Sequence, residues 1–195
     1  MRSKIRPKTI EFFYDIVSPY SYLASERIET LTERNGVEIH WRPFLLGGLH
    51  KITGNPPPGL QDFKKPYLGK DLRRLSKYYE IPYQFPKQFP TRTILAQRAL
   101  TAVAEEQRPE ATHALYRAYW VGGEDVADPE VVVRLVGPEA VEAAGTQPIK
   151  DALIQATEEA AKRGTYGAPA FFVGEEQFFG QDRMDLLEAH LQGRL

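Results

Sequence analysis

The 195-residue sequence contains no cysteine. The chain therefore cannot form a disulfide bond, use a thiolate nucleophile of its own or bind a metal through thiolates, and any sulfur chemistry must come from a ligand. An excess of positive charge is also missing, because 25 Lys and Arg are balanced by 26 Asp and Glu, for a formal net charge of −1. A nucleic acid is therefore not an expected partner.

Long hydrophobic runs are absent as well, so the sequence predicts no membrane partner. The basic segment 1–8 (MRSKIRPK) is not followed by the apolar run that a signal peptide requires. We therefore expect a cytoplasmic protein, with an organellar import signal as the minor alternative. The length and the hydrophobic share of 42% fit one compact unit with room for an insertion.

The hydrophobic pattern of the N-terminal part predicts a β-α-β unit. Residues 9–16 (TIEFFYDI) are typical of a buried strand, and 19–36 have the spacing of a helix that ends at a glycine. Residues 37–44 (VEIHWRPF) alternate apolar and polar side chains, as in a strand with one wet face. The Gly- and Pro-rich segment 45–59 is expected to be a long functional loop.

The remainder of the chain predicts a helical block and then a β-β-α unit. Residues 60–163 contain several segments of helical periodicity between Pro and Gly breaks. Two short strands, 170–174 and 176–180, follow with a tight turn between them, and an amphipathic helix closes the chain. We expect a layered α/β fold in which a helical insertion splits the sheet, with ligands bound beyond the carboxyl ends of the strands.

Ser18 lies where the first predicted strand meets the first helix, in the stretch FYDIVSPYSYLA (13–24). Ser before Pro is a common helix start, so a plain N-cap explains the residue. A hydroxyl at the positive end of a helix is also suited to hold an anion. The two roles are compatible, and the sequence leaves both open.

Other catalytic patterns find little support. A serine hydrolase is not indicated, because the GxSxG motif is absent and no histidine has a recognisable relation to Ser18. No pair of histidines has the spacing of metal ligands, so we expect no metal site. The histidines are expected to be structural or exposed: His40, His50, His113 and His190.

Pro169, in GAPAFFVG (167–174), precedes the strand that returns after the helical block. A trans proline that begins a strand is the ordinary interpretation. A cis Ala168–Pro169 bond would instead turn the backbone of Ala168 toward the start of the first helix. The sequence does not decide between them.

Four motifs in order resemble the 2-hydroxychromene-2-carboxylate isomerases and the kappa-class glutathione transferases, which belong to the DsbA branch of the thioredoxin superfamily. They are FYDIVSPYSYLA, PFLLGGLHKITGNPPPG (43–59), GAPAFFVG and FFGQDRMDLLEAHL (178–191). The resemblance covers about residues 9–193 and implies a thioredoxin-like fold, formed by 1–59 and 164–195, with 60–163 as an all-helical insertion.

In this superfamily the place of Ser18 holds the first cysteine of a Cys-x-x-Cys pair, and SPYS here has hydroxyls at both ends, which excludes thiol–disulfide exchange. The resemblance implies that the protein binds glutathione and that Ser18 donates a hydrogen bond to its sulfur. Asn55 and Lys64 are implied near the glycyl end of the tripeptide, with Lys64 pairing a carboxylate.

The resemblance also assigns the other end of glutathione. Asp182 would face the γ-glutamyl ammonium and Gln181 its carboxylate, while the backbone of Ala168, before Pro169, would pair with the cysteinyl unit. Each residue also fits a simple structural role as a turn, cap or surface residue, and only their joint occurrence favours the site. Kappa-class transferases usually have Ser at the place of Gln181, which favours the isomerase.

An apolar pocket for an aromatic co-substrate could be formed by PFLLGG and aromatic side chains, although such residues more often belong to a core. The candidate aromatics are Tyr20, Tyr22, Tyr83 and Phe85. Lys51 or Arg92 could pair with a substrate carboxylate, although both have the character of ordinary surface residues.

The sequence thus predicts a glutathione-dependent isomerase that acts on a small aromatic substrate resembling 2-hydroxychromene-2-carboxylate, and family resemblance suggests a homodimer. The first alternative is a kappa-like glutathione transferase or peroxidase, in which the thiol is consumed. The second is a non-catalytic binding or chaperone module on the same fold, which would not bind glutathione.

Overall fold

The computed structural model describes residues 9–195, so the basic segment 1–8, with the import signal considered for it, lies outside the described residues. A four-stranded sheet in the order β2-β1-β3-β4 forms its centre. Strand β1 (Thr9–Tyr14) pairs parallel with β2 (Glu38–Pro43) and antiparallel with β3 (Ala170–Val173). Strand β4 (Glu176–Phe179) pairs antiparallel with β3. The expected β-α-β and β-β-α units therefore share one sheet.

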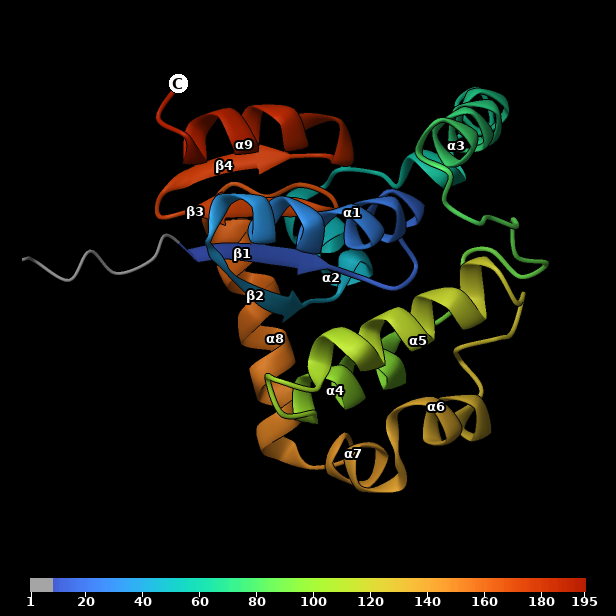
Figure 1. Ribbon diagram of the computed structural model, residues 1–195. Helices are drawn as coiled ribbons and strands as arrows, with labels where there is room; N and C mark the ends of the chain where they lie inside the picture. The colour runs from blue at the N-terminus through green and yellow to red at the C-terminus, as the bar shows by residue number, and fades with distance from the viewer. Residues whose placement is uncertain (1–8) are drawn as a thin grey trace, which may run out of the picture.

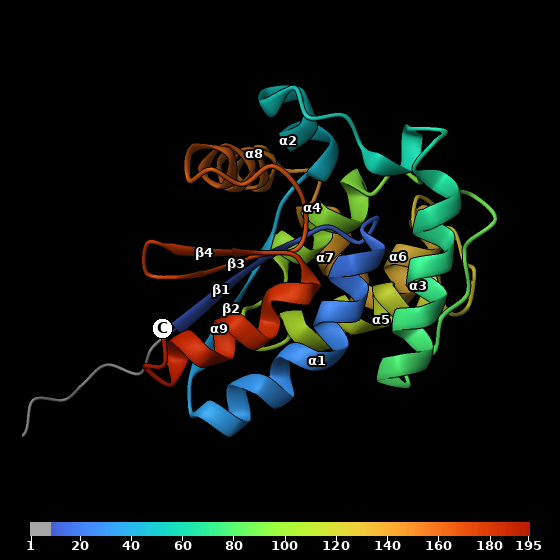
Figure 2. The ribbon, with the colours of Figure 1, turned by 90° about the horizontal axis from the view of Figure 1, so that it is seen from above.

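Helices cover both faces of this sheet (Figure 2). Helices α1 (Pro19–Asn35) and α9 (Met184–Leu191) lie on one face, and α2 (Leu46–Thr53) and α8 (Gln147–Lys162) lie on the other. Neighbouring residues of β1 serve the two faces, because successive side chains of a strand point to opposite sides. Phe12 belongs to the larger core cluster beneath α1, and Phe13 to the smaller one beneath α8.

The other helices lie off the sheet. In Figure 1, α3 lies at the upper right and the group α4 to α7 lies below β2. Their bounds are Pro58–Leu60 for the 3-10 helix η1, Lys65–Tyr79 for α3, Ile94–Ala102 for α4, Arg108–Trp120 for α5, Pro129–Val136 for α6 and Pro138–Ala143 for α7.

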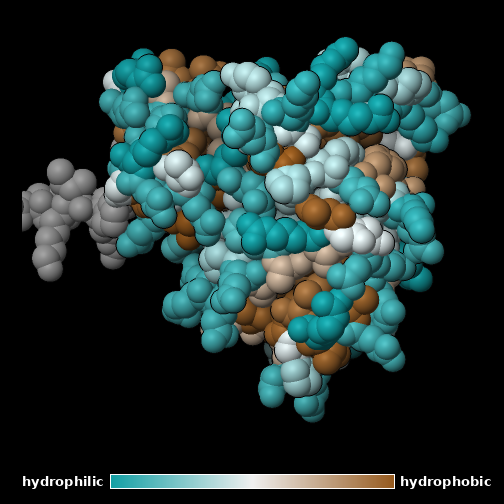
Figure 3. Space-filling view, turned by 45° about the vertical axis from the view of Figure 1, so that its right-hand side comes forward, coloured by the Kyte–Doolittle hydropathy of each residue, from teal (hydrophilic) through white to brown (hydrophobic). Residues whose placement is uncertain are grey.

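Figure 3 shows a mainly hydrophilic surface whose hydrophobic groups gather over the lower helices. No helix in the described part of the chain has both the length and the apolarity to cross a bilayer.

The segment 45–59 is not the continuous loop that we expected, because its first half forms α2. Two glycines obscure the helical pattern, but Leu49 is fully buried in the cluster beneath α8. Gly54, at φ +69°, ends the helix in the left-handed conformation that favours glycine. Tertiary packing therefore stabilises a short helix of weak intrinsic propensity.

Strands β1, β2 and β4 point the same way, so their carboxyl ends lie at one edge of the sheet. Helix α1 begins at this edge, the 3-10 helix η2 (Gln181–Arg183) leads into α9 there, and α3 lies beside them (Figure 1). This edge is the place where open α/β sheets bind ligands.

Candidate functional site

Ser18 is the N-cap of α1. Its Oγ accepts a hydrogen bond from the Ser21 backbone N–H at 3.1 Å, and Pro19 occupies the first helical position. The same Oγ donates to the backbone carbonyl of Ala168 at 3.1 Å, and the residue is 3% exposed. Ser18 is therefore a cap and also the link between α1 and a loop 150 residues later in the chain.

The Ala168–Pro169 peptide bond is cis, which decides the alternative that the sequence left open. The strand β3 begins directly after it, at Ala170. The Ala168 carbonyl thus lies at the start of α1, as expected for the cis form. Peptide N–H groups at a helix start favour negative charge, so this corner can hold an anion beside the Ser18 hydroxyl.

Asp15 lies below Ser18 at the end of β1, is 1% exposed, and its backbone carbonyl accepts the Ser18 N–H at 2.9 Å. Its carboxylate accepts hydrogen bonds from the N–H of Val17 at 3.1 Å, the N–H of Leu46 at 2.8 Å and the hydroxyl of Thr93 at 2.7 Å. Burial raises the pKa of this carboxyl, against the three hydrogen bonds.

Asp15 therefore joins the starts of α1, α2 and α4 beneath the candidate site. Sequence reasoning missed this role. The signal was an acidic residue directly after the buried run Phe12–Tyr14, where a charge needs several partners.

Asn55 and Lys64 differ in how the structure places them. Asn55 donates its side-chain amide to the backbone carbonyl of Tyr166 at 2.8 Å, which brings it to the loop that precedes Ala168. Lys64 lies immediately before α3, with its ammonium 5.6 Å from the ring centre of Phe63. No hydrogen bond or ion pair among residues 9–195 joins Lys64 to the other expected site residues.

Gln181 and Asp182 lie in η2, directly after Gly180. Gln181 is 4% exposed, and its side-chain oxygen accepts a hydrogen bond from Arg27 of α1 at 3.0 Å. Asp182 is exposed and pairs with Arg183 at 2.7 Å. Its carboxylate passes over Gly180, where an added Cβ would lie 2.5 Å from Oδ1.

Tyr20, Asp71 and Asp182 form an acidic corner next to the start of α1. The Tyr20 hydroxyl donates to the Asp71 carboxylate at 2.8 Å. Burial and the charges of both carboxylates raise the pKa of Tyr20. Such a corner favours an ammonium group. Asp71 was missed in the sequence, although it is the one acidic residue in the α3 stretch KPYLGKDLRRLSKYY.

The aromatic residues considered for a co-substrate pocket are partly buried in the core and partly exposed. Tyr22 is 1% exposed and donates to the carbonyl of Pro82, so it belongs to the core. Tyr83 stacks on Trp120 with ring centres 6.0 Å apart, and Phe85 remains 46% exposed. Lys51 and Arg92 are also exposed.

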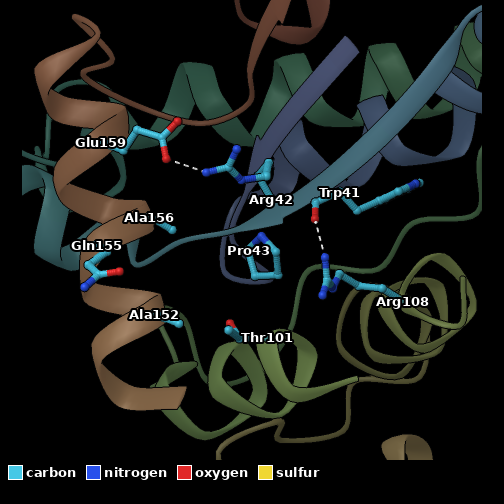
Figure 4. Close-up of a pocket in the computed structure, with 9 residues that line it drawn as sticks. All are labelled: Trp41, Arg42, Pro43, Thr101, Arg108, Ala152, Gln155, Ala156 and Glu159. Atoms are coloured by element: carbon cyan, nitrogen blue, oxygen red, sulfur yellow. Dashed lines mark hydrogen bonds and ion pairs between the residues drawn. The ribbon is translucent and has the colours of Figure 1, made fainter. Parts of the chain in front are cut away.

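One cavity of about 220 Å³ lies away from Ser18, between β2, α4 and α8 (Figure 4). On its rim Arg42 pairs with Glu159, and Arg108 donates to the Trp41 carbonyl at 3.1 Å. Because these guanidinium groups are already bound by the protein, we assign the cavity no role in the candidate site.

Known proteins resemble this chain over nearly its whole length. The family model described as the DSBA-like thioredoxin domain matches residues 9–192. The chain is 35% identical to glutathione S-transferase kappa 1 of Homo sapiens, over 96% of this chain and 92% of that protein. It is 31% identical to the 2-hydroxychromene-2-carboxylate isomerase of Sphingobium xenophagum, over 94% and 98%.

A solved 2-hydroxychromene-2-carboxylate isomerase has a TM-score of 0.84 and 26% identity to this chain, with 95% of each chain covered. These relatives are enzymes of two kinds, an isomerase and a transferase. They confirm the resemblance seen in the four motifs.

Proposed function

The chain belongs to the DSBA-like thioredoxin domain family, and within that family we propose that it is a glutathione-dependent isomerase of small aromatic substrates. The observation that carries the proposal is the position of Ser18. Its hydroxyl lies at the start of α1 and at hydrogen-bond distance from the backbone before cis Pro169, in a chain without cysteine. Any thiol chemistry therefore needs a thiol from a ligand, and the helix start and the hydroxyl support binding of such a thiol as an anion.

The residues around Ser18 fit glutathione. The acidic corner favours the γ-glutamyl ammonium, and the Ala168 carbonyl can accept the cysteinyl N–H. Asn55, held at Tyr166, and Lys64, ahead of α3, are proposed for the glycyl end.

Gln181 is proposed for the γ-glutamyl carboxylate. Because Arg27 donates to both the side-chain oxygen and the backbone carbonyl of Gln181, the backbone N–H and the side-chain NH₂ group carry that role.

Held at the Ser18 hydroxyl, the Ala168 carbonyl and the acidic corner, glutathione would supply reversible nucleophilic catalysis of a double-bond isomerisation. The protein lowers the pKa of the thiol, which is about 8.5 when free. The Ser18 hydroxyl and the start of α1 each contribute on the order of 1 kcal/mol to the anion. Together they correspond to a pKa lower by about 1 to 2, which raises the ionised fraction at pH 7 from a few per cent to between about one quarter and about three quarters.

A second candidate is a glutathione transferase in which the thiol is consumed. It is favoured by the 35% identity to the human kappa transferase. The isomerase is favoured by Gln181, since kappa-class transferases usually have Ser at this place, and by a match that covers 98% of the Sphingobium isomerase. The Ser18 corner serves both reactions, so the two differ in what binds beside the sulfur.

Calorimetric titration with glutathione tests the shared part of the proposal. Two assays then separate the candidates, one with a hydroxychromene carboxylate and one with a chlorinated aromatic acceptor. A changing substrate spectrum with constant free thiol supports the isomerase, and loss of free thiol supports the transferase. Absence of glutathione binding would contradict both and favour a non-catalytic module.

The resemblance to the family also supports a homodimer that acts in the cytoplasm, and light scattering in solution tests the dimer. The division into a thioredoxin-like unit (1–59 and 164–195) and a helical insertion (60–163) stays a prediction. Limited proteolysis at the two junctions tests that division.

A further inference from the structure

The Ser18 hydroxyl has one proton to donate, and the Ala168 carbonyl and the sulfur of a bound thiol compete for it. In the structure this proton is donated to the Ala168 carbonyl at 3.1 Å, while the Ser21 N–H occupies a lone pair of the same oxygen at 3.1 Å. Under the proposed function the same proton must be donated to the sulfur of a bound thiol. A hydroxyl has a single donor, so it cannot make both hydrogen bonds at full strength.

The Ala168 carbonyl would lose its donor when the hydroxyl turns to sulfur. Ala168 is only partly exposed, and a ligand in this corner removes water from it. A carbonyl left without a donor loses about one hydrogen bond, which is roughly a tenfold change in an equilibrium. Release of Ser18 is therefore unfavourable unless the ligand brings a new donor for this carbonyl.

We infer that Ser18 is held by the Ala168 carbonyl in the free protein and is released to a thiol only when an amide N–H of the ligand takes its place on that carbonyl. The inference rests on the proposed function and deepens it by naming the ligand class. The site activates thiols that carry a peptide N–H on the carbon adjacent to the thiol-bearing carbon, as a cysteinyl peptide does. Thiols without that N–H can bind but remain largely protonated.

Because the Ser21 N–H holds the Ser18 oxygen, only the Ser18 proton changes its partner in this exchange. This N–H keeps the Ser18 oxygen in place as the cap of α1, so the hydroxyl group changes its acceptor by rotation of the O–H alone. No movement of the backbone is required. The device therefore discriminates between thiols by one hydrogen bond rather than by the shape of a pocket.

The test compares glutathione with two of its ester analogues. In the first, an ester replaces the amide between the γ-glutamyl and cysteinyl units, which removes the N–H proposed for Ala168. In the second, an ester replaces the cysteinyl–glycine amide, which removes a different N–H and serves as the matched control. The pKa of each bound thiol is measured by ultraviolet difference absorbance over a pH titration at saturating ligand, with affinity measured separately by calorimetry.

For glutathione and for the control ester, we expect the pKa of the bound thiol to lie below the pKa of the same ligand free in solution. For the first ester the bound thiol pKa is expected to be about 1 higher, which makes the thiolate fraction at pH 7 about threefold to eightfold smaller. In Ser18→Ala, the three ligands are expected to show the same change in thiol pKa on binding, because the hydroxyl that distinguishes them is gone.

Equal lowering of the pKa for glutathione and both esters in the wild-type protein would overturn this inference and leave the proposed function in place. If bound glutathione itself keeps the pKa of the free thiol, the proposed function is wrong, and the inference fails with it.

Discussion

Replacement of Ser18 by alanine separates its structural role from its chemical role. The change removes the hydrogen bond accepted from Ser21 N–H and the one donated to the Ala168 carbonyl. Loss of an N-cap costs about 1 kcal/mol, and the second hydrogen bond contributes about the same. We therefore expect the free energy of unfolding to fall by about 2 kcal/mol, which urea titration can measure.

The chemical effect of Ser18→Ala is predicted from the thiol. Without the hydroxyl, the pKa of bound glutathione is expected to rise by about 1, so the thiolate fraction at pH 7, and the turnover with it, fall by about threefold to eightfold. Ser25→Ala is the matched control, because Ser25 is fully buried in the same helix and donates to the Tyr22 carbonyl at 2.8 Å. It should lower stability by about 1 kcal/mol and leave the thiol pKa unchanged. Wild-type thiol pKa and turnover in Ser18→Ala would show that the serine is only a cap.

Three further perturbations test the surroundings. Gly180→Ala places a Cβ 2.5 Å from Asp182 Oδ1 at φ +96°, so we expect roughly tenfold weaker glutathione binding by calorimetry. The control Gly174→Ala, at φ +60° with open space around it, should affect stability alone. Equal affinities in the two variants would contradict this prediction. Lys64→Ala and Asp182→Asn should reduce the thermal shift given by glutathione. The control Lys65→Ala removes an exposed ion pair with Asp62 and should leave the shift unchanged. A full thermal shift in the first two variants would show that Lys64 and Asp182 do not bind glutathione. Burial opposes the charge of His113, but Glu26 and Glu29 raise its pKa from 6.5 to about 9, so its stabilising contribution is complete below pH 6.5 and is lost as the pH rises through about 9. Partial solvent screening leaves about 1 to 2 kcal/mol, so His113→Gln should lower the free energy of unfolding at about pH 6 and have little effect at about pH 10; a constant difference would refute the assignment.

The strands and the Ser18 corner could be predicted because their signals are local. The β-branched and aromatic residues of TIEFFYDI mark β1, and Ser18-Pro19 marks the start of α1. Helix α2 could not be predicted, because Gly47 and Gly48 weaken its propensity and its stability comes from contacts with α8.

The contacts of the site depend on distant segments. The hydrogen bond from Ser18 to Ala168 spans 150 residues, and the carboxylate of Asp15 reaches Thr93, 78 residues away. No spacing in the sequence indicates such pairs, so the four motifs could name residues of the site but not their partners. Asp71 shows the same limit, since its role depends on Tyr20 of α1.

A crystal structure of the protein with glutathione tests the central claim most directly. The account predicts that the glutathione sulfur lies within hydrogen-bond distance of Ser18 Oγ, at the start of α1, with the cysteinyl N–H on the Ala168 carbonyl. A corner without glutathione at saturating concentration, or a sulfur bound far from Ser18, would contradict it.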